Sequence, residues 1–309
     1  MVNLRQFPQM KIPSLIIVSL LFLSCNSNKA ARSFTGDVSY FNAISPNDIK
    51  LEDPLGGEWR FYHNEAHQAF DDYQKAEPEK AIYGKTKLYL LPLGSFTPLQ
   101  LKGIELTREY LQIFFQLKTE ILEPVANETI PDSARRTRSG GNTQLFTPYI
   151  MQHLLKGKIP SKGYALMAIS EKDLYPDPAW NYVFGIASYT DRIGVSSIFR
   201  YQGDGLTANN FTLFLKRLIG TASHEIGHMF SIHHCVAAKC VMNGSNSLSE
   251  SDRQTLRLCS ECQQKLYWNI GYNNKTRLQA LADYFRRNQL PEDLLYLEKD
   301  LKAAEGKNN

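Results

Sequence analysis

Short apolar runs and longer amphipathic stretches alternate along most of the chain. The run at 87–93 is compact, apolar and ended by Gly94, and the run at 164–169 is similar, so both predict buried strands. The stretch 98–122 carries apolar residues at helical spacing behind Pro98, a residue favoured at the first helical position. This pattern predicts strands and helices that share one core.

The middle of the chain predicts an antiparallel pair of strands. Apolar stretches at 182–188 and 192–201 are separated by only three polar-turn residues, and so short a connection cannot join parallel neighbours. Further helices are predicted at 66–75, 145–156, 209–230, 277–288 and 292–304. The order of elements indicates an α/β fold, with some α+β character, in which the mixed sheet has at least one antiparallel edge.

The composition is that of a globular protein with a substantial core. Hydrophobic residues make up 43% of the 309 residues and charged residues 21%, and the formal net charge is +4. The densest basic run, Arg135–Arg138, precedes a Ser-Gly-Gly sequence and has no aromatic or helical framework. We therefore expect a solvated loop there and no nucleic-acid partner.

The N-terminus predicts export. Lys11 precedes an apolar stretch, 12–23, which is too short to span a membrane as a mature helix and is followed by Ser24 and Cys25. A cysteine after a small residue resembles a bacterial lipoprotein signal, so Cys25 is the predicted lipidation site and membrane anchor. A plain secretory signal or an uncleaved anchor is the alternative. The expected location is therefore the bacterial cell envelope, to which the protein is anchored as an exported lipoprotein.

Three of the four histidines within the eleven residues 224–234 form the strongest candidate site. His224 and His228 are four residues apart, so on a helix both imidazoles project from one face and can bind a single ion. This His-Glu-x-x-His spacing is a known zinc-peptidase signature. His234 adds a third ligand and leaves the fourth position open, which is the catalytic arrangement. Because consecutive residues in an extended turn point opposite ways, we expect His234 and not His233 to face the metal. Glu225 is then the predicted general base that activates a zinc-bound water.

The cysteines indicate a second site. Cys235 and Cys240 form one close pair, and Cys259 and Cys262 form another. Two close pairs separated by a loop have the spacing of a closed, structural tetrathiolate zinc site. Two disulfides are the alternative, because an exported compartment favours them. The expected cofactors are therefore two zinc ions, one catalytic and one structural.

The stretch 224–266 resembles the archaemetzincins, a metzincin-clan family of metallopeptidases. The motifs that carry the resemblance are His-Glu-Ile-Gly-His-Met-Phe, His234-Cys235, Cys240-Val241-Met242, Gly244-Ser245-Asn246 and Cys259-Ser260-Glu261-Cys262. Few families join a zinc-peptidase helix to a four-cysteine site. Weaker similarity extends over about 86–272, and residues 57–73 resemble the N-terminal segment of bacterial and eukaryotic members.

The resemblance implies a metzincin-like zincin fold: a twisted mixed sheet with one antiparallel edge strand, backing helices, an active-site helix below an open cleft, and a structural zinc subsite. It implies a Met turn at Met242 beneath the ligand histidines. It also places strand 182–188 along the cleft, where unpaired backbone groups can hold an extended substrate.

One position departs from the family pattern. Metzincins have glycine where this chain has Ser231. A left-handed conformation costs a non-glycine residue roughly 1–2 kcal/mol. A zinc site supplies binding energy on the order of 10 kcal/mol or more. We therefore expect the chain to bind metal despite the serine. The serine affects the geometry of the turn, and through it the activity, more than it affects metal binding.

The sequence thus predicts a monomeric zinc metallopeptidase that hydrolyses peptide or protein substrates, and the resemblance suggests small peptides and an aminopeptidase-like preference. The expected parts are a signal peptide (1–25), a polar tether and N-terminal extension (26–80), a metallopeptidase domain (81–273) and C-terminal helices (274–309). One alternative is a catalytically inactive, zinc-stabilised peptide-binding protein, which the change at Ser231 would permit. The other is a zinc-ribbon-like interaction module over 235–262, which the export signal and the lack of a basic face disfavour.

Overall fold

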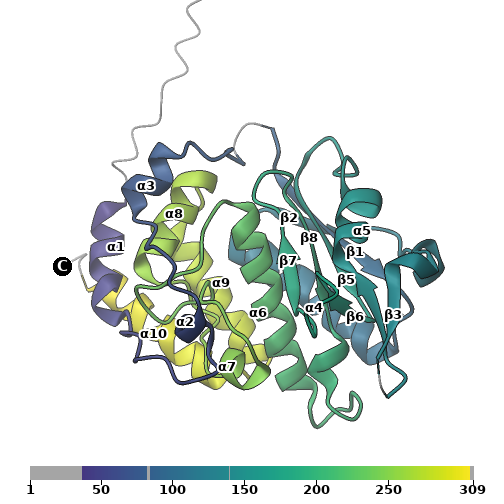
Figure 1. Cartoon of the computed structure of the whole chain (residues 1–309). Helices are drawn as coiled ribbons and strands as arrows, with labels where there is room; N and C mark the ends of the chain where they lie inside the picture. Colours follow the sequence, from purple (N-terminus) through teal and green to yellow (C-terminus); the bar gives the residue numbers. More distant parts are fainter. Residues whose placement is uncertain (1–36, 82–83, 139, 307–309) are drawn as a thin grey trace, which may run out of the picture. The chain divides into compact units, whose positions relative to one another are not determined.

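A five-stranded mixed sheet, in the order β2-β1-β5-β8-β7, is the framework of the fold (Figure 1). Four strands are parallel: β2 (Lys118–Ile121), β1 (Lys87–Leu93), β5 (Gly163–Ser170) and β8 (Ile193–Ser197). The edge strand β7 (Gly185–Ala187) is antiparallel to β8. The predicted mixed α/β fold with one antiparallel edge strand is confirmed.

The strands β1 and β5 are apolar over most of their length because both faces of the sheet are covered. In β1, Leu88 and Leu90 belong to one hydrophobic cluster, whereas Leu91 and Leu93 belong to the cluster on the opposite face. Successive side chains of a strand point to opposite faces, so a strand buried on both sides is a continuous apolar run. This is the pattern from which the strand was predicted.

Helices α4 (Pro98–Phe115) and α6 (Phe211–Met229) cover one face of the sheet. A capping box fixes the start of α4, because the Thr97 side chain accepts from the Gln100 backbone N–H while the Gln100 side chain accepts from the Thr97 backbone N–H. Figure 1 shows further helices beyond α6, on its side away from the sheet. Among them are α1 (Val38–Ile44), α8 (Ser260–Ile270), α9 (Asn274–Arg287) and α10 (Pro291–Glu305).

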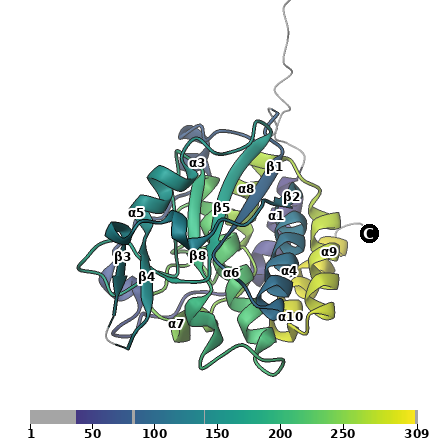
Figure 2. The ribbon, with the colours of Figure 1, turned by 90° about the vertical axis from the view of Figure 1, so that its right-hand side faces the viewer.

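A smaller sheet and a short helical segment cover the other face (Figure 2). The sheet has the order β3-β4-β6, formed by β3 (Arg135–Thr137), β4 (Thr143–Phe146) and β6 (Asp173–Tyr175). Helix α5 (Thr147–Tyr149) continues as a π-helix at Ile150–Leu155. The remaining helices are α2 (Trp59–Tyr62), α3 (Phe70–Lys75) and α7 (Leu248–Asp252), with 3₁₀ turns at Ser45–Asn47, Asn127–Thr129, Asp132–Ala134 and Phe199–Gln202.

Several predicted bounds were wrong. The helix predicted over 98–122 ends at Phe115, where Gln116 takes a left-handed conformation and the chain enters β2. The helix predicted from residue 145 begins at Thr147, because the preceding residues pair in β4. The two strands predicted at 182–188 and 192–201 are shorter, and α8 was missed.

The basic run Arg135–Arg138 is not a solvated loop. Its first three residues form β3, and the Arg136 guanidinium donates to the carbonyl oxygens of Pro178 and Asn181. The same guanidinium lies 4.0 Å from the centre of the Tyr175 ring. These contacts attach the loop at 178–181 to the small sheet, so the positive charge has a structural role.

The computed structural model describes residues 37–81, 84–138 and 140–306. The predicted signal peptide and its Cys25 lie outside this range. Within the described residues no helix is long and apolar enough to cross a membrane.

Candidate metal centre and active site

The end of helix α6 and the loop behind it bring the three predicted histidine ligands together. His224 and His228 lie one turn apart near the end of α6. Just beyond the helix, Ser231 adopts a left-handed conformation with φ of 62°, and the chain turns back so that His234 faces the other two. One ring nitrogen of each histidine lies within 4.8 Å of those of the other two. In this chain a serine, Ser231, therefore forms the turn for which metzincins use glycine.

Main-chain acceptors fix the orientation of the two helical histidines. The Nδ1 atom of His224 lies 2.8 Å from the carbonyl oxygen of Val241, and Nδ1 of His228 lies 2.7 Å from that of Ile232. Because a carbonyl oxygen can only accept, each Nδ1 carries the proton and each Nε2 presents a lone pair.

The Nε2 atoms of His224 and His228 lie 3.0 Å apart, which is the arrangement of ligands that share a cation. Burial, reinforced by neighbouring histidines, lowers the pKa of His224 to about 4 and that of His228 well below its ordinary value, so both rings are neutral at pH 7. With both protons on Nδ1, neither Nε2 can donate to the other. Two nitrogens bound to one tetrahedral zinc ion lie about 3.3 Å apart. The donor set therefore fits zinc.

His234 has a carboxylate partner. Its Nδ1 lies 2.8 Å and 3.0 Å from the two carboxylate oxygens of Glu65, and the indole Nε1 of Trp59 donates to the same carboxylate at 3.0 Å. Burial raises the pKa of Glu65. The hydrogen bonds from His234 and Trp59 lower it by more, so the net pKa lies below the ordinary value. Glu65 is therefore ionised at neutral pH.

Glu225 lies beside the histidines, between α6 and the edge strand β7. It is buried, and the cost of desolvating its charge raises the pKa to about 8 in the absence of a metal. A β-carbon placed on Gly185 would lie 2.5 Å from Oε1 of Glu225. The missing side chain at Gly185 thus makes the space that the carboxyl group occupies.

A cleft of about 540 Å³ opens over this site. Its lining includes the three histidines, Glu225 and the segment 182–187, which contains β7. Trp59, Trp180 and Tyr189 form further parts of the wall. Because β7 is an edge strand of the sheet, an extended chain placed along it can pair with its backbone.

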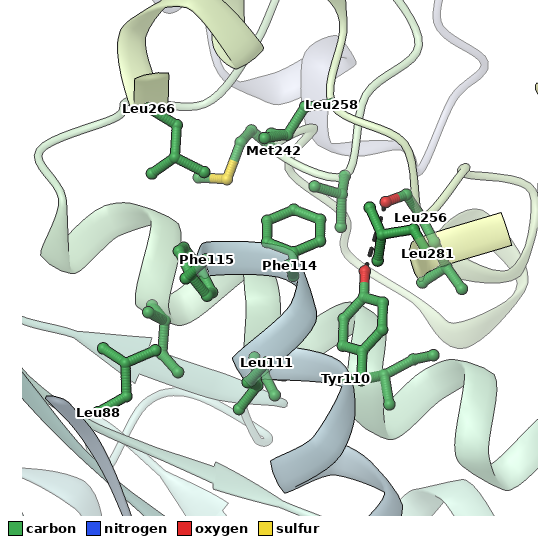
Figure 3. Close-up of a cluster of buried hydrophobic side chains, with 14 of the residues drawn as sticks. Leu88, Tyr110, Leu111, Phe114, Phe115, Met242, Leu256, Leu258, Leu266 and Leu281 are labelled. Carbon is green, nitrogen blue, oxygen red and sulfur yellow. Dashed lines mark hydrogen bonds between the residues drawn. The ribbon is translucent and has the colours of Figure 1, made fainter. Parts of the chain in front are cut away.

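Met242 lies directly under the histidine helix. Its side chain is fully buried, in the core that contains Phe114, Phe115 and Leu266 (Figure 3). A β-carbon on Gly227 of α6 would collide with the Met242 sulfur. Close packing of a methionine beneath the ligand helix is the arrangement expected of the Met turn.

The four predicted cysteines also converge. Their sulfur atoms lie within 4.8 Å of one another, and those of Cys235 and Cys259 are 3.7 Å apart. All four residues are buried free thiols, so the two-disulfide alternative is not what the structure contains.

The four sulfur atoms of this cluster form a donor set that suits a cation. Backbone N–H groups of Met242 and Cys259 donate to the Cys240 sulfur, as they do to thiolates. Hydrogen bonds from the other three cysteines lower the pKa of Cys235. Hydrogen bonds with Cys235 and Cys240 raise the pKa of Cys259 and Cys262 well above the ordinary value. Four thiolates therefore do not coexist here without a positive ion, and the set fits a closed zinc site.

Two contributors to the histidine site were missed from the sequence. Glu65 lies 169 residues before His234, and no spacing rule connects them. Gly185 was predicted only as part of a strand. The similarity of 57–73 to the N-terminal segment of the family was the one available signal, and it gave no role to Glu65.

Comparisons with known proteins agree with this geometry. The model of Peptidase family M54 matches residues 156–267. Archaemetzincin-2 of Rattus norvegicus is 33% identical over 263 residues, covering 74% of this chain and 72% of that protein. Archaemetzincin-2 of Homo sapiens is 31% identical over 265 residues, covering 76% and 73%.

The fold also has a solved counterpart. The crystal structure of archaemetzincin from Methanopyrus kandleri matches with a TM-score of 0.50 and 24% identity, covering 62% of this chain and 98% of that chain. The predicted metzincin-like fold is confirmed. Since a relative above 30% identity matches over more than two thirds of its length, the chain belongs to the archaemetzincin family of zinc metallopeptidases.

Proposed function

We propose that this peptidase hydrolyses peptide bonds at the three-histidine centre, with Glu225 as the general base. The observation that supports this most directly is the convergence of three imidazole rings, with one nitrogen of each within 4.8 Å of the others, beside a buried carboxyl group that lines a cleft. His224, His228 and His234 would hold a zinc ion, which would supply Lewis-acid chemistry for the scissile carbonyl and would lower the pKa of water to about 7.

The chain's own residues then move the proton and place the substrate. Glu225 takes a proton from the attacking water and passes it to the nitrogen of the leaving amine. Its burial favours holding that proton between the two steps, whereas the positive charge of a nearby metal favours releasing it. The edge strand β7 holds the substrate in extended form by backbone pairing.

The finer assignments belong to the same proposal. We propose two zinc ions, the second held by the four cysteines and structural because that site is closed and buried.

An aminopeptidase-like preference for small peptides follows from the family resemblance alone. Paired peptide libraries with free and acetylated N-termini separate it from endopeptidase action. Anchoring through Cys25 is likewise a proposal, which Cys25→Ser tests by its release from the membrane fraction.

The central experiment combines a peptide-library digest with elemental analysis. Wild-type protein is expected to cleave peptides and to hold two zinc ions. Glu225→Gln should keep both ions and lose about 10²- to 10⁴-fold in kcat/KM, since a general base contributes that much. Glu105→Gln, on the exposed side of α4, is the matched control and should behave as wild type.

Two results would contradict the proposal. Full zinc-dependent hydrolysis by Glu225→Gln would remove the assigned base. A wild-type protein that binds zinc at the histidines but turns over no peptide would favour the inactive peptide-binding alternative. His228→Ala should lose one zinc ion and Cys240→Ser the other.

A further inference from the structure

We propose that Glu65 is a positioning residue of the metal centre, supplied by the N-terminal extension. In this arrangement it holds the ring of His234 so that Nε2 faces the ion. The inference rests on the proposed function, because it assumes that the three histidines bind metal.

His234 needs a partner that the other two ligands do not. His224 and His228 are held by a rigid helix and by carbonyl oxygens of neighbouring loops. His234 lies beyond the helix, in a segment without regular secondary structure. Among the residues that the structure describes, its Nδ1 forms its hydrogen bonds with the carboxylate of Glu65. A carboxylate that accepts from a ligand histidine fixes its tautomer and orientation and raises its basicity.

Glu65 is itself held in place by a second contact. The indole N–H of Trp59 donates to Oε2 of Glu65, while the Trp59 ring stacks on His63 with centroids 3.7 Å apart and meets the His234 ring edge-on at 5.0 Å. A β-carbon on Gly244 would collide with the Trp59 ring. The Gly-Ser-Asn segment after the Met turn thus leaves room for Trp59, which orients the carboxylate.

The same extension also spans the left-handed turn. The Gln68 side chain donates to the carbonyl oxygen of Ser231 at 3.0 Å and accepts from the backbone N–H of His233 at 3.1 Å. These bonds join the two sides of the segment in which Ser231 has φ of 62°. The extension therefore stabilises the turn at which this chain has serine, and Glu65 orients the ligand that follows it.

Attachments on either side make the extension a fixed part of the domain. Asp48 accepts from the backbone N–H of Ser260 at the start of α8, and the backbone N–H of Lys239 donates to Ile49 at 2.8 Å. On the other side, the buried hydroxyl of Tyr73 donates to the carbonyl oxygen of Phe230 at 2.7 Å. Glu65 is therefore delivered to His234 by a segment that is anchored at both ends.

The test measures zinc affinity of the full chain by chelator competition, with the cysteine site loaded. Glu65→Ala is expected to weaken zinc at the histidine site about 10- to 100-fold, the usual loss on removing a carboxylate behind a ligand histidine. Glu65→Gln keeps the shape and one acceptor oxygen, so its loss should be smaller but measurable, and it decides the question if the alanine variant does not fold. Glu52→Gln, an exposed carboxylate of the same extension, is the control and should bind as wild type.

A merely structural role would give a different pattern. It would lower the melting temperature of the metal-free Glu65 variants and leave the zinc affinity of the histidine site unchanged, which would overturn the inference. The visible spectrum of the cobalt-substituted protein is a second readout, because altered geometry at His234 should change its absorption bands. If wild-type protein itself has no metal at the histidines, the proposed function fails together with this inference. If wild-type protein binds zinc tightly at the histidines, and Glu65→Ala and Glu65→Gln bind it equally tightly, only the proposed role of Glu65 is wrong.

Discussion

Gly185→Ala tests whether the position of the Glu225 carboxylate controls the rate. The added β-carbon would lie 2.5 Å from Oε1 and 2.8 Å from Cγ and Cδ of Glu225. Carbon atoms pack at about 3.5–4.0 Å, so the carboxylate must retreat by about 1 Å. A misplacement of this size costs on the order of 10²-fold, which corresponds to about 2.7 kcal/mol of activation free energy.

The assay is kcat/KM on the best peptide from the library, with zinc content measured on the same samples. Gly185→Ala should retain both zinc ions, because its new methyl group meets Glu225 and no ligand histidine. In a Glu225→Gln background the same substitution should add less than about a twofold loss, since residues that act as a unit are not additive. Gly56→Ala, where a β-carbon meets nothing within 4 Å, is the control.

Two outcomes would refute this reasoning. A Gly185→Ala enzyme with wild-type kcat/KM would show that the carboxylate tolerates displacement. A further loss on the order of 10²-fold in the Glu225→Gln background would show that Gly185 acts on substrate binding along β7 and not through the base.

Two predictions concern stability. In metal-free protein the folded state keeps the Glu225 proton up to a pKa of about 8, whereas the unfolded state loses it near 4.5, so this group's contribution to the free energy of unfolding falls as pH rises through that window. The free energy of unfolding of metal-free Glu225→Gln should therefore rise relative to that of wild type by up to about 1.4 kcal/mol per pH unit between about pH 4.5 and 8. Melting temperatures measured across this range check the trend, and a pH-independent difference would contradict the burial of that charge. Ser231→Gly should relieve the left-handed backbone at φ 62° and stabilise the protein by about 1 kcal/mol, measured as a higher melting temperature. Ser231→Ala keeps the β-carbon and should show no gain, so equal melting temperatures for the two variants would count against strain at this turn.

The sequence predicted those parts of the site that lie close together along the chain. His224 and His228 share a helix face because of their spacing, and His234 follows after one turn. The pairing of Cys235 and Cys240 with Cys259 and Cys262 was also visible as spacing. Local geometry fixes such arrangements, so residue identity and separation are enough to predict them.

Short strands could not be predicted in this way. The strands β2, β3 and β6 have only three or four residues each, and their extended form depends on pairing with β1 and β4. Charged residues in Lys118–Ile121 and Arg135–Thr137 gave no apolar run. Their pairing partners, which lie elsewhere in the chain, override the local pattern.

The sequence by itself therefore determined the candidate ligands, the family resemblance and the main layers of the fold. Tertiary structure alone decided which side chains support those ligands: Glu65 behind His234, Gln68 across the turn at Ser231, and the space at Gly185 that admits Glu225. The physical reason is distance along the chain. Ligand spacing follows from the repeat of one helix, whereas a supporting hydrogen bond or an unfilled space depends on segments that meet only after the whole domain has packed.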